Sequence, residues 1–272
     1  MRDNQPTVGS LFSGGGGMDK GFEDAGFRVL WQCETNEACR QVLERHWPGV
    51  LRFGDVRGLV GALPNLLPSP DVLIGGDPCP KFSRARGGRA SRSPDLSGYF
   101  LALAGRLRPR WVVRENVPSP AVADFHAALE SLGYGAIVVR VDAASFTAQQ
   151  RVRDFIVGLD QAPRTSVAIL FSDCLMDAGC ATAPIAPGPG PAPCLDAHPA
   201  RDCGSTLYVA EPPWGFRLLD SEEREALAGF PRRWTEGFSR TARARICGNA
   251  VPPPVAEWIA MKILGGWLDR KG

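Results

Sequence analysis

The feature that most constrains the fold is a run of four glycines, Gly14 to Gly17, between a short apolar stretch and a helical pattern. The stretch Thr7–Phe12 predicts a strand, and Met18–Ala25 predicts a helix that ends at Gly26. Glycine lets the backbone approach a ligand closely at a helix N-terminus, an arrangement that α/β proteins use to bind nucleotides. The start of the chain therefore predicts a βα unit with a binding site at its turn.

The same alternation of apolar runs, turn residues and helical segments continues to about residue 160. It predicts strands at Val29–Cys33, Asp71–Ile74, Trp111–Val113, Ala136–Val141 and Asp154–Leu159, and helices at Glu37–His46, Gly98–Leu107 and Ala121–Leu132. Repeated βα units predict a doubly wound, mostly parallel sheet with helices on both faces. The expected fold class is α/β.

The pattern breaks after residue 160, and between Ala181 and Pro193 alanine, proline and glycine alternate with almost no core-forming side chain. Gly and Pro supply 31 and 24 of the 272 residues, which excludes a helical bundle or a coiled coil. Helices are expected again at Ser221–Ala228 and Val255–Leu264. We expect three parts: a catalytic and cofactor-binding domain at 1–165, a small irregular insertion at 166–239, and a C-terminal segment at 240–272 that returns to the first domain.

Composition excludes several classes of protein. The 31 basic and 29 acidic residues leave a formal net charge of +2, so any site for a polyanion must be local. No apolar run approaches the roughly 18 residues that span a membrane, and no export signal is apparent. Eight cysteines are far below the density of a disulfide scaffold. We expect a cytoplasmic protein with reduced thiols and no membrane partner.

The spacing of the glycine run restricts the cofactor that it fits. The dinucleotide fingerprint requires a third glycine where this chain has Asp19 or Lys20, and no Walker lysine is present. A glycine turn without a phosphate signature suits a cofactor with an adenosine and no pyrophosphate, of which S-adenosylmethionine is the common one. Glu34 follows Gly14 by 20 residues, where a carboxylate can accept hydrogen bonds from ribose hydroxyls. The alternative is a tight turn without a ligand.

A second group of reactive residues follows the strand expected at Asp71–Ile74. Cys79 stands between Pro78 and Pro80 at the carboxyl end of this strand, where ligands bind in α/β folds. The residues that follow include five cations and no acid: Lys81, Arg84, Arg86, Arg89 and Arg92. Such a loop lowers the pKa of a thiol and can bind phosphates. A buried structural cysteine and a solvated basic loop are the alternatives.

The next expected strand ends in the tripeptide Glu115-Asn116-Val117. Adjacent parallel strands would bring Glu115 to the same edge of the sheet as Cys79, which would pair a thiol nucleophile with a carboxyl group that can donate a proton. Three residues are a weak motif, and this one gains weight from its position after the cysteine turn.

In their order along the chain, these elements resemble the motifs of the cytosine-C5 DNA methyltransferase family. The matching segments are Leu11–Gly17 (cofactor loop), Glu34 (ribose-binding acid), Gly54-Asp55-Val56 (adenine segment), Pro78-Cys79 (catalytic Pro-Cys), Glu115-Asn116-Val117 (ENV), Gln149–Arg153 (Q-x-R-x-R) and Gly248–Pro253 (last motif). They cover nearly the whole chain apart from about residues 160–216. The resemblance implies a Rossmann-like class I methyltransferase fold in which the insertion is a small target-recognition region.

The resemblance also implies an activity, that of a DNA (cytosine-5-)-methyltransferase with S-adenosyl-L-methionine as its cofactor. The Cys79 thiolate would add to cytosine C6 while Glu115 acts at N3, on a base flipped out of the duplex. The implied catalytic residues are Cys79, Glu115, Arg151 and Arg153. The implied cofactor-binding residues are Phe12, Ser13, Gly14, Gly16, Glu34, Asp55, Val56, Asn249 and Val251. The implied DNA contacts are Lys81, Ser83, Arg84, Arg86 and Gln149, and no metal ligand is implied.

The chain departs from the family pattern at two places. Asp77 replaces the first residue of the more usual Pro-Pro-Cys-Gln, and a carboxylate there would raise the pKa of the Cys79 thiol if the two side chains approach. Between residues 166 and 203 only Arg201 is a long basic side chain suited to major-groove readout. Recognition is expected to use a short site, a partner, or the flanking residues Arg217, Arg232 and Arg233.

The remaining cysteines suggest no further chemistry. The insertion holds Cys174, Cys180, Cys194, Cys203 and His198, but their spacing lacks the paired C-x2–4-C of structural zinc sites. We therefore assign no metal. Core or surface thiols are expected at Cys33, Cys39 and Cys247.

Three alternative functions are weighed against DNA methylation. The same chemistry on cytosine in RNA or in a free nucleotide fits the reduced insertion. A catalytically silent DNA-binding homologue is disfavoured because the implied catalytic residues are all present, and a nicotinamide oxidoreductase because the third glycine is missing. We expect a monomer that acts on double-stranded DNA, encoded by a bacterium or a phage, associated with the nucleoid through DNA and active in restriction-modification.

Overall fold

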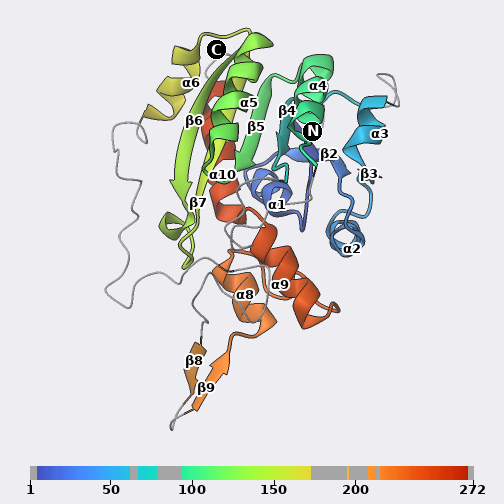
Figure 1. Cartoon of the computed structure of the whole chain (residues 1–272), viewed down its shortest axis with the longest axis vertical. Helices are drawn as coiled ribbons and strands as arrows, with labels where there is room; N and C mark the ends of the chain where they lie inside the picture. Colours follow the sequence, from blue (N-terminus) through green and yellow to red (C-terminus); the bar gives the residue numbers. More distant parts are fainter. Residues whose placement is uncertain are drawn as a thin grey trace.

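The computed structural model of the chain describes residues 5–61, 67–78, 94–172, 195, 208–211 and 215–268. A seven-stranded sheet in the order β3-β2-β1-β4-β5-β7-β6 forms its centre (Figure 1). The strands are β1 (Thr7–Leu11), β2 (Arg28–Cys33), β3 (Leu51–Phe53), β4 (Val72–Gly75), β5 (Trp111–Asn116), β6 (Tyr134–Asp142) and β7 (Val152–Asp160). Neighbouring strands pair in parallel except β7, which is antiparallel to β5 and β6. The predicted α/β class with a mostly parallel sheet is confirmed.

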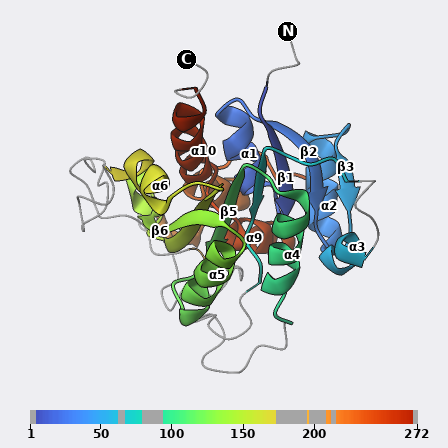
Figure 2. The same cartoon turned by 90° about the horizontal axis from the view of Figure 1, so that it is seen from above.

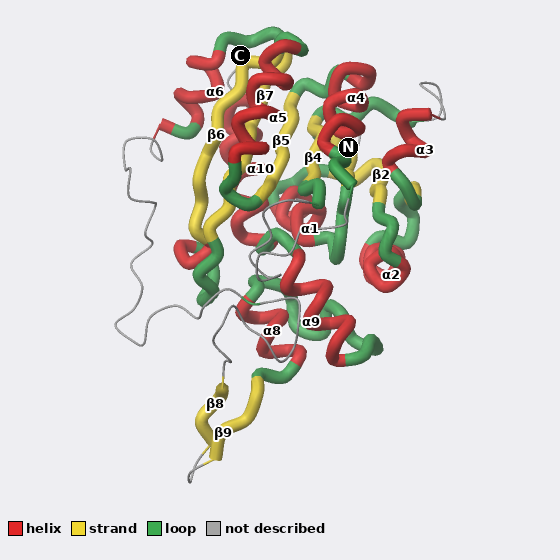
Figure 3. Tube along the Cα trace, viewed as in Figure 1, coloured by secondary structure: helices red, strands yellow, loops and turns green. Residues whose placement is uncertain are grey.

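Helices cover both faces of this sheet (Figures 2 and 3). They are α1 (Gly17–Asp24), α2 (Glu37–His46), α3 (Val56–Gly61), α4 (Ser97–Leu107), α5 (Pro120–Ser131), the 3-10 turn η2 (Ala143–Ser145), α6 (Arg164–Leu170), α8 (Ser221–Leu227), α9 (Arg240–Asn249) and α10 (Pro253–Leu268). Helices α1, α6 and α10 pack on one face and α3, α4 and α5 on the other. Alternating side chains supply both cores: Val72 and Ile74 of β4 face α1, and Leu73 faces α4.

A third apolar cluster joins α2 to the C-terminal part of the chain. Its members include Val42, Leu43, Trp47, Phe230, Trp234 and Ile246. In Figure 1, α8 and α9 lie below the lower end of the sheet, and the hairpin of β8 (Tyr208–Glu211) and β9 (Gly215–Leu218) extends further in the same direction. The segment expected to form an insertion is thus partly packed against the sheet domain.

Local signals placed most elements correctly. Helix α2 has the predicted bounds, and its N-cap Asn36 accepts a hydrogen bond from the Cys39 amide at 3.1 Å. Helix α8 begins at the predicted position with a capping box between Asp220 and Glu223. Helix α10 begins at Pro253, two residues before the predicted Val255, and it continues beyond the predicted Leu264 to Leu268. The earlier start is possible because proline is well tolerated in the first turn of a helix.

Other elements carried no usable signal. The sequence analysis did not predict β3, α3, α6, α9 or the β8–β9 hairpin. Strand β3 has only three residues, and α9 lacks an apolar stripe because it alternates arginine with small residues. The boundary expected after residue 165 falls inside α6, which packs on the sheet, so the three-part division stays a prediction. No helix in the described ranges combines the length and hydropathy needed to cross a membrane.

Helices α1 and α10 approach so closely that no side chain fits between them at Gly21. A Cβ atom added there would lie 2.4 Å from the Pro253 carbonyl oxygen and 2.6 Å from the Ala256 Cβ atom. Backbone cannot move aside as a flexible side chain can. Gly21 therefore sets the distance at which the C-terminal helix packs against the first helix.

We expect Gly21→Ala to lower the free energy of unfolding by about 2 kcal/mol, because overpacking outweighs the gain in helix propensity. Gly58→Ala in α3 is the matched control: no atom lies within 4 Å of an added Cβ, so we expect unchanged or higher stability. Urea unfolding of both variants measures the difference. Equal shifts for the two variants would contradict this account of Gly21.

Candidate active site

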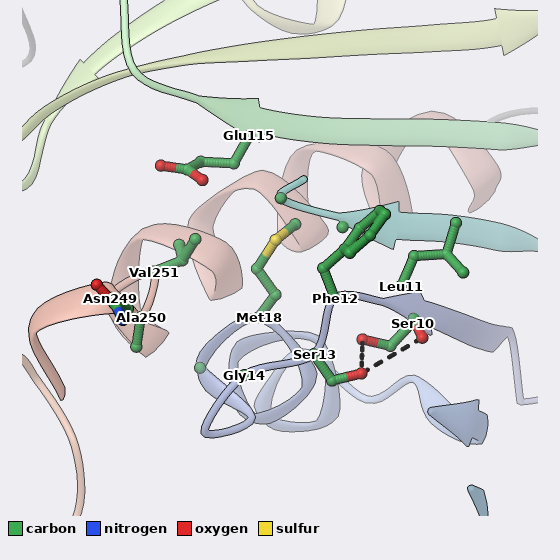
Figure 4. A pocket seen from close by; sticks show the side chains of 13 residues that line it. Ser10, Leu11, Phe12, Ser13, Gly14, Met18, Glu115, Asn249, Ala250 and Val251 are labelled. Atoms are coloured by element: carbon green, nitrogen blue, oxygen red, sulfur yellow. Dashed lines mark hydrogen bonds between the residues drawn. The ribbon is translucent and has the colours of Figure 1, made fainter. Parts of the chain in front are cut away.

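A pocket opens beside the loop that joins β1 to α1, and residues from four segments line it (Figure 4). The lining consists of Ser10, Leu11, Phe12, Ser13, Gly14, Gly17, Met18, Gly75, Gly76, Glu115, Asn249, Ala250 and Val251. Five of the expected cofactor residues are therefore found together: Phe12, Ser13, Gly14, Asn249 and Val251. Glu115, expected to act on the substrate, lines the same pocket.

The loop after β1 has an unusual backbone. Phe12, Gly14 and Gly16 have φ angles of 54°, 55° and 80°, in the left-handed region. A non-glycine residue rarely adopts this conformation, and strain of this kind collects at binding sites. An added Cβ at Gly14 would meet only the Phe12 carbonyl oxygen, at 3.9 Å, so this glycine leaves the pocket side open.

The other three glycines face protein atoms, which the sequence analysis did not foresee. A Cβ atom added at each would lie 2.4 Å from Ile246 (Gly15), 2.6 Å from the Trp47 ring (Gly16) and 2.0 Å from the Val251 carbonyl oxygen (Gly17). The uniform run is thus required largely by close packing of α2 and the C-terminal segment on the loop. Gly16, expected to contact the cofactor, is covered by Trp47 and Leu43.

A tryptophan from the C-terminal part of the chain supports the same loop. The indole N–H of Trp234 donates a buried hydrogen bond to the Gly15 carbonyl oxygen at 2.8 Å. The His46 ring stacks on this indole, with 3.5 Å between ring centroids and an interplanar angle of 3°. The hydrogen bond between Trp234 and Gly15 joins segments more than 200 residues apart. No local sequence pattern could have indicated it.

A buried polar network lies beneath the loop. Asp19 is fully buried and accepts hydrogen bonds from Ser10 Oγ at 3.0 Å and Gln32 Nε2 at 2.9 Å. The Ser13 hydroxyl lies 2.8 Å from Ser10 Oγ (Figure 4). Burial raises the pKa of Asp19 to about 6, and the two side-chain hydrogen bonds offset only part of this shift. The carboxyl group therefore titrates just below neutral pH.

The acid expected to bind the ribose is attached to the same loop. Glu34 accepts hydrogen bonds from the Gly14 amide at 2.8 Å and from the Asn36 amide at 2.7 Å. Asp55 instead directly precedes α3 and forms an ion pair with Arg57, whose hydrogen bonds lower the pKa of the Asp55 carboxyl group. Val56 is buried. Among these three expected cofactor residues, Glu34 forms a hydrogen bond with a residue of the pocket lining, Gly14.

The two arginines of the expected Q-x-R-x-R element have different partners. Arg153 binds Glu115, with 2.9 Å between Nε and Oε1. Arg151 is 5% exposed, and its Nη1 atom donates to the Gly248 carbonyl oxygen at 3.0 Å. Gln149, expected to contact DNA, is buried as well. One arginine thus holds the carboxylate in the pocket, and the other ties the start of β7 to the end of α9.

Several expected site residues lie outside the described ranges. They are the nucleophile Cys79, the basic residues Lys81, Arg84 and Arg86, Ser83, Arg201, and the cysteines and histidine of the insertion. The three described cysteines, Cys33, Cys39 and Cys247, are buried free thiols whose pKa burial raises to about 12. Within the described ranges no three His, Cys, Asp or Glu side chains form a cluster that could hold a metal.

Arginines expected to flank the recognition region are paired with acids. Arg217 binds Glu223 through two hydrogen bonds of 2.6 and 2.7 Å. The exposed Arg232 and Arg233 contact Glu222 and Glu236. Weak exposed pairs of this kind can be exchanged for other anions.

The lining also includes residues that were not expected individually at the site. Leu11, Gly17 and Ala250 belong to the segments matched to the family motifs, whereas Ser10, Met18, Gly75 and Gly76 lie outside those segments. A signal existed for Gly75 and Gly76, since two glycines at the end of a strand permit close approach. Ser10 and Met18 had none, because their positions follow from the packing of α1.

The chain is similar in sequence to known DNA methyltransferases. The chain matches the C-5 cytosine-specific DNA methylase family over residues 7–173 and 198–265. The Type II methyltransferase M2.BsuMI of Bacillus subtilis is 29% identical over 93% of this chain and 74% of its own length. The Type II methyltransferase M.HindV of Haemophilus influenzae is 25% identical over 93% of this chain and 95% of its own length.

Solved structures share the fold. A putative DNA modification methyltransferase encoded within an E. coli prophage superposes with a TM-score of 0.69, at 19% identity, over 97% of this chain and 100% of its own. A variant of Spodoptera frugiperda DNMT2 gives the same TM-score at 13% identity, over 96% of this chain and 100% of its own. These similarities support the Rossmann-like arrangement of the sheet.

The raised pKa of Asp19 predicts a pH dependence of stability. The folded state holds its proton up to about pH 6, and the unfolded state only to about 3.8, so stability falls as pH rises through this window. The Asp19→Asn variant has no buried carboxylate to ionise. We expect its free energy of unfolding to exceed that of the wild type at pH 7, by up to about 3 kcal/mol, but not at pH 3.5.

Chemical unfolding at a series of pH values measures this difference. Asp124→Asn, which removes an exposed carboxylate on α5, is the control and is expected to show no such trend. A difference between Asp19→Asn and the wild type that is constant from pH 3.5 to 7 would refute the assignment.

Proposed function

This chain belongs to the C-5 cytosine-specific DNA methylase family, and we propose that it performs methyl transfer through a covalent bond between Cys79 and a flipped-out cytosine. The enzyme is a DNA cytosine-5-methyltransferase that uses S-adenosylmethionine as its methyl donor. One observation carries the proposal: the glycine loop, Asn249 and Val251 line one pocket together with Glu115. A cofactor and a substrate base bound there would meet.

The residues around the glycine loop fit this cofactor. Gly14 leaves its side of the loop open, and the Glu34 carboxylate beside it has lone pairs left to accept hydrogen bonds from ribose hydroxyls. When bound, S-adenosylmethionine supplies an electrophilic methyl group. We assign Phe12, Ser13, Gly14, Glu34, Asn249 and Val251 to its binding, with Gly16, Asp55 and Val56 shaping the surrounding loops.

Protein side chains must activate the substrate, because cytosine C5 is a poor nucleophile. The Cys79 thiolate adds to C6 while the Glu115 carboxyl group donates a hydrogen bond or proton at N3, which gives an enamine. Carbon C5 of this enamine then takes the methyl group. Loss of the C5 proton and expulsion of the thiolate restore the aromatic ring.

Two arginines position this machinery. Arg153 orients Glu115 through the 2.9 Å ion pair, so it acts directly on the catalytic carboxyl group. Arg151 acts through the C-terminal segment, whose residues Asn249 and Val251 follow the Gly248 carbonyl that it holds. Both arginines therefore serve the site, through different partners.

Access to C6 requires the base to leave the duplex. Extrusion costs a few kcal/mol of stacking and pairing. We propose that Lys81, Arg84 and Arg86, with Ser83, contact the DNA backbone and offset this cost. The region 166–239 would read a short target, the enzyme would act as a monomer on double-stranded DNA, and its role would be that of the Type II relatives in restriction-modification.

We expect Cys79→Ala to abolish both turnover and formation of a covalent adduct with 5-fluorocytosine DNA, because the adduct requires the thiolate. Cys39→Ala, which removes a buried thiol in α2, should retain both. Labelled-cofactor assays with duplex DNA and denaturing gels give the two readouts. Methyl transfer by Cys79→Ala would exclude this nucleophile.

Glu115→Gln should reduce kcat by about 100- to 10,000-fold, the usual contribution of a general acid. The change keeps the shape of the side chain, so we expect the affinity for S-adenosylmethionine to stay within twofold. Single-turnover kinetics and calorimetric titration separate the two effects. A fall in cofactor affinity without a fall in kcat would contradict the role proposed for Glu115.

A further inference from the structure

A buried ion pair holds the chain two residues before the proposed nucleophile. The Asp77 carboxylate accepts hydrogen bonds from Nε and Nη2 of Arg114 at 2.5 and 2.9 Å, and both side chains are 2% exposed. Two parallel N–H···O bonds fix the plane of each group as well as the distance between them. Asp77 could leave this position only by exposing the Arg114 charge to the apolar core.

Strand β5 holds the backbone of Asp77 as well. Asn116 Nδ2 donates to the Asp77 carbonyl oxygen at 3.1 Å, and the Arg114 guanidinium lies 4.2 Å from the centroid of the Phe125 ring in α5. The stacked ring restricts the guanidinium. The side chain and the main chain of Asp77 are therefore both fixed to β5.

The alternation of β5 places this pair behind the pocket. Arg114 and Asn116 point to the α5 face of the sheet, while Glu115 between them lines the pocket on the other face. A Cβ atom added at Gly76 would lie 2.7 Å from Glu115 Oε2. Strand β5 thus carries the proposed catalytic carboxyl group on Glu115, and its neighbours Arg114 and Asn116 hold the segment that leads into Pro78-Cys79.

Stability alone gives no reason for a charged pair at this position. Burying two ions costs free energy, and an apolar pair of similar size often stabilises a protein equally well or better. Among the described residues, Arg114 Nη1 finds no hydrogen-bond partner, so the pair is not optimally satisfied. The Asp77 carboxylate faces Arg114, on the face of the sheet opposite the pocket.

We propose that Asp77 and Arg114 are positioning residues for the nucleophile: Arg114 holds Asp77, and Asp77 sets the direction in which the chain enters Pro78-Cys79. The proposal rests on the proposed function of Cys79. It predicts that weakening the pair slows attack on C6 without weakening cofactor binding.

Arg114→Lys tests this directly, because lysine keeps the buried charge but cannot form the bidentate contact. Asp77→Asn is the second variant, which keeps the size of the side chain. Arg108→Lys is the matched control: Arg108 also binds an aspartate, Asp160, and packs over an aromatic ring, that of Tyr134, but at the opposite end of the sheet.

The rate of adduct formation with 5-fluorocytosine duplexes, at saturating cofactor and across pH 6–9, is the main readout. We expect Arg114→Lys and Asp77→Asn to react at least tenfold more slowly at every pH, with an unchanged pH midpoint and with cofactor affinity within twofold of the wild type. Arg108→Lys should react at the wild-type rate. Circular dichroism identifies any variant that does not fold, and the other variant then decides.

Each contrary result has a separate meaning. Wild-type adduct rates in folded Arg114→Lys would overturn the positioning role. A shifted pH midpoint with an unchanged maximal rate would overturn it too, since the pair would then act on the thiol pKa. Failure of the wild-type protein to form any adduct would instead refute the proposed function of Cys79.

Discussion

The site depends on one steric constraint, the close packing of the C-terminal segment on the loop after β1. Backbone atoms of Val251 and Pro253 lie where side chains at Gly17 and Gly21 would stand, and the Trp234 indole holds the Gly15 carbonyl. The loop can take its left-handed turns because this packing determines its shape. Residues that are far apart in the sequence, and that we propose to bind the cofactor, thereby line one pocket.

Much of the fold follows from local signals, and part of the site does not. The βα alternation indicated six of the seven strands of the sheet, and the bounds of α2 were predicted correctly, whereas β3 is too short and α9 is too weakly patterned. For the glycine run, a sequence shows that Cβ atoms are missing but not which neighbour takes their space, so it could not show that Trp47 and Leu43 cover Gly16, which was expected to contact the cofactor. Arg151 precedes β7, so strand alternation could not show that its partner differs from that of Arg153.

The acidic side chains around the site are compensated by neighbouring groups. Glu34 accepts hydrogen bonds from two backbone amides, Glu115 forms an ion pair with Arg153, and Asp77 forms an ion pair with Arg114. In the proposed mechanism, such compensation would keep free negative charge away from the thiolate and from DNA phosphates. Asp19 differs, because it accepts side-chain hydrogen bonds from the neutral Ser10 and Gln32, and its burial raises its pKa.

The contact between Trp234 and Gly15 also has a consequence for biosynthesis. Ribosomes add about 5–20 residues per second, and domains made of early segments can fold while later ones are still being made. Here the cofactor loop belongs to the first part of the chain, but the residues that support it come from 234–256. A nascent chain therefore cannot hold the loop after β1 in this shape until the segment 234–256 has been synthesised and has left the exit tunnel.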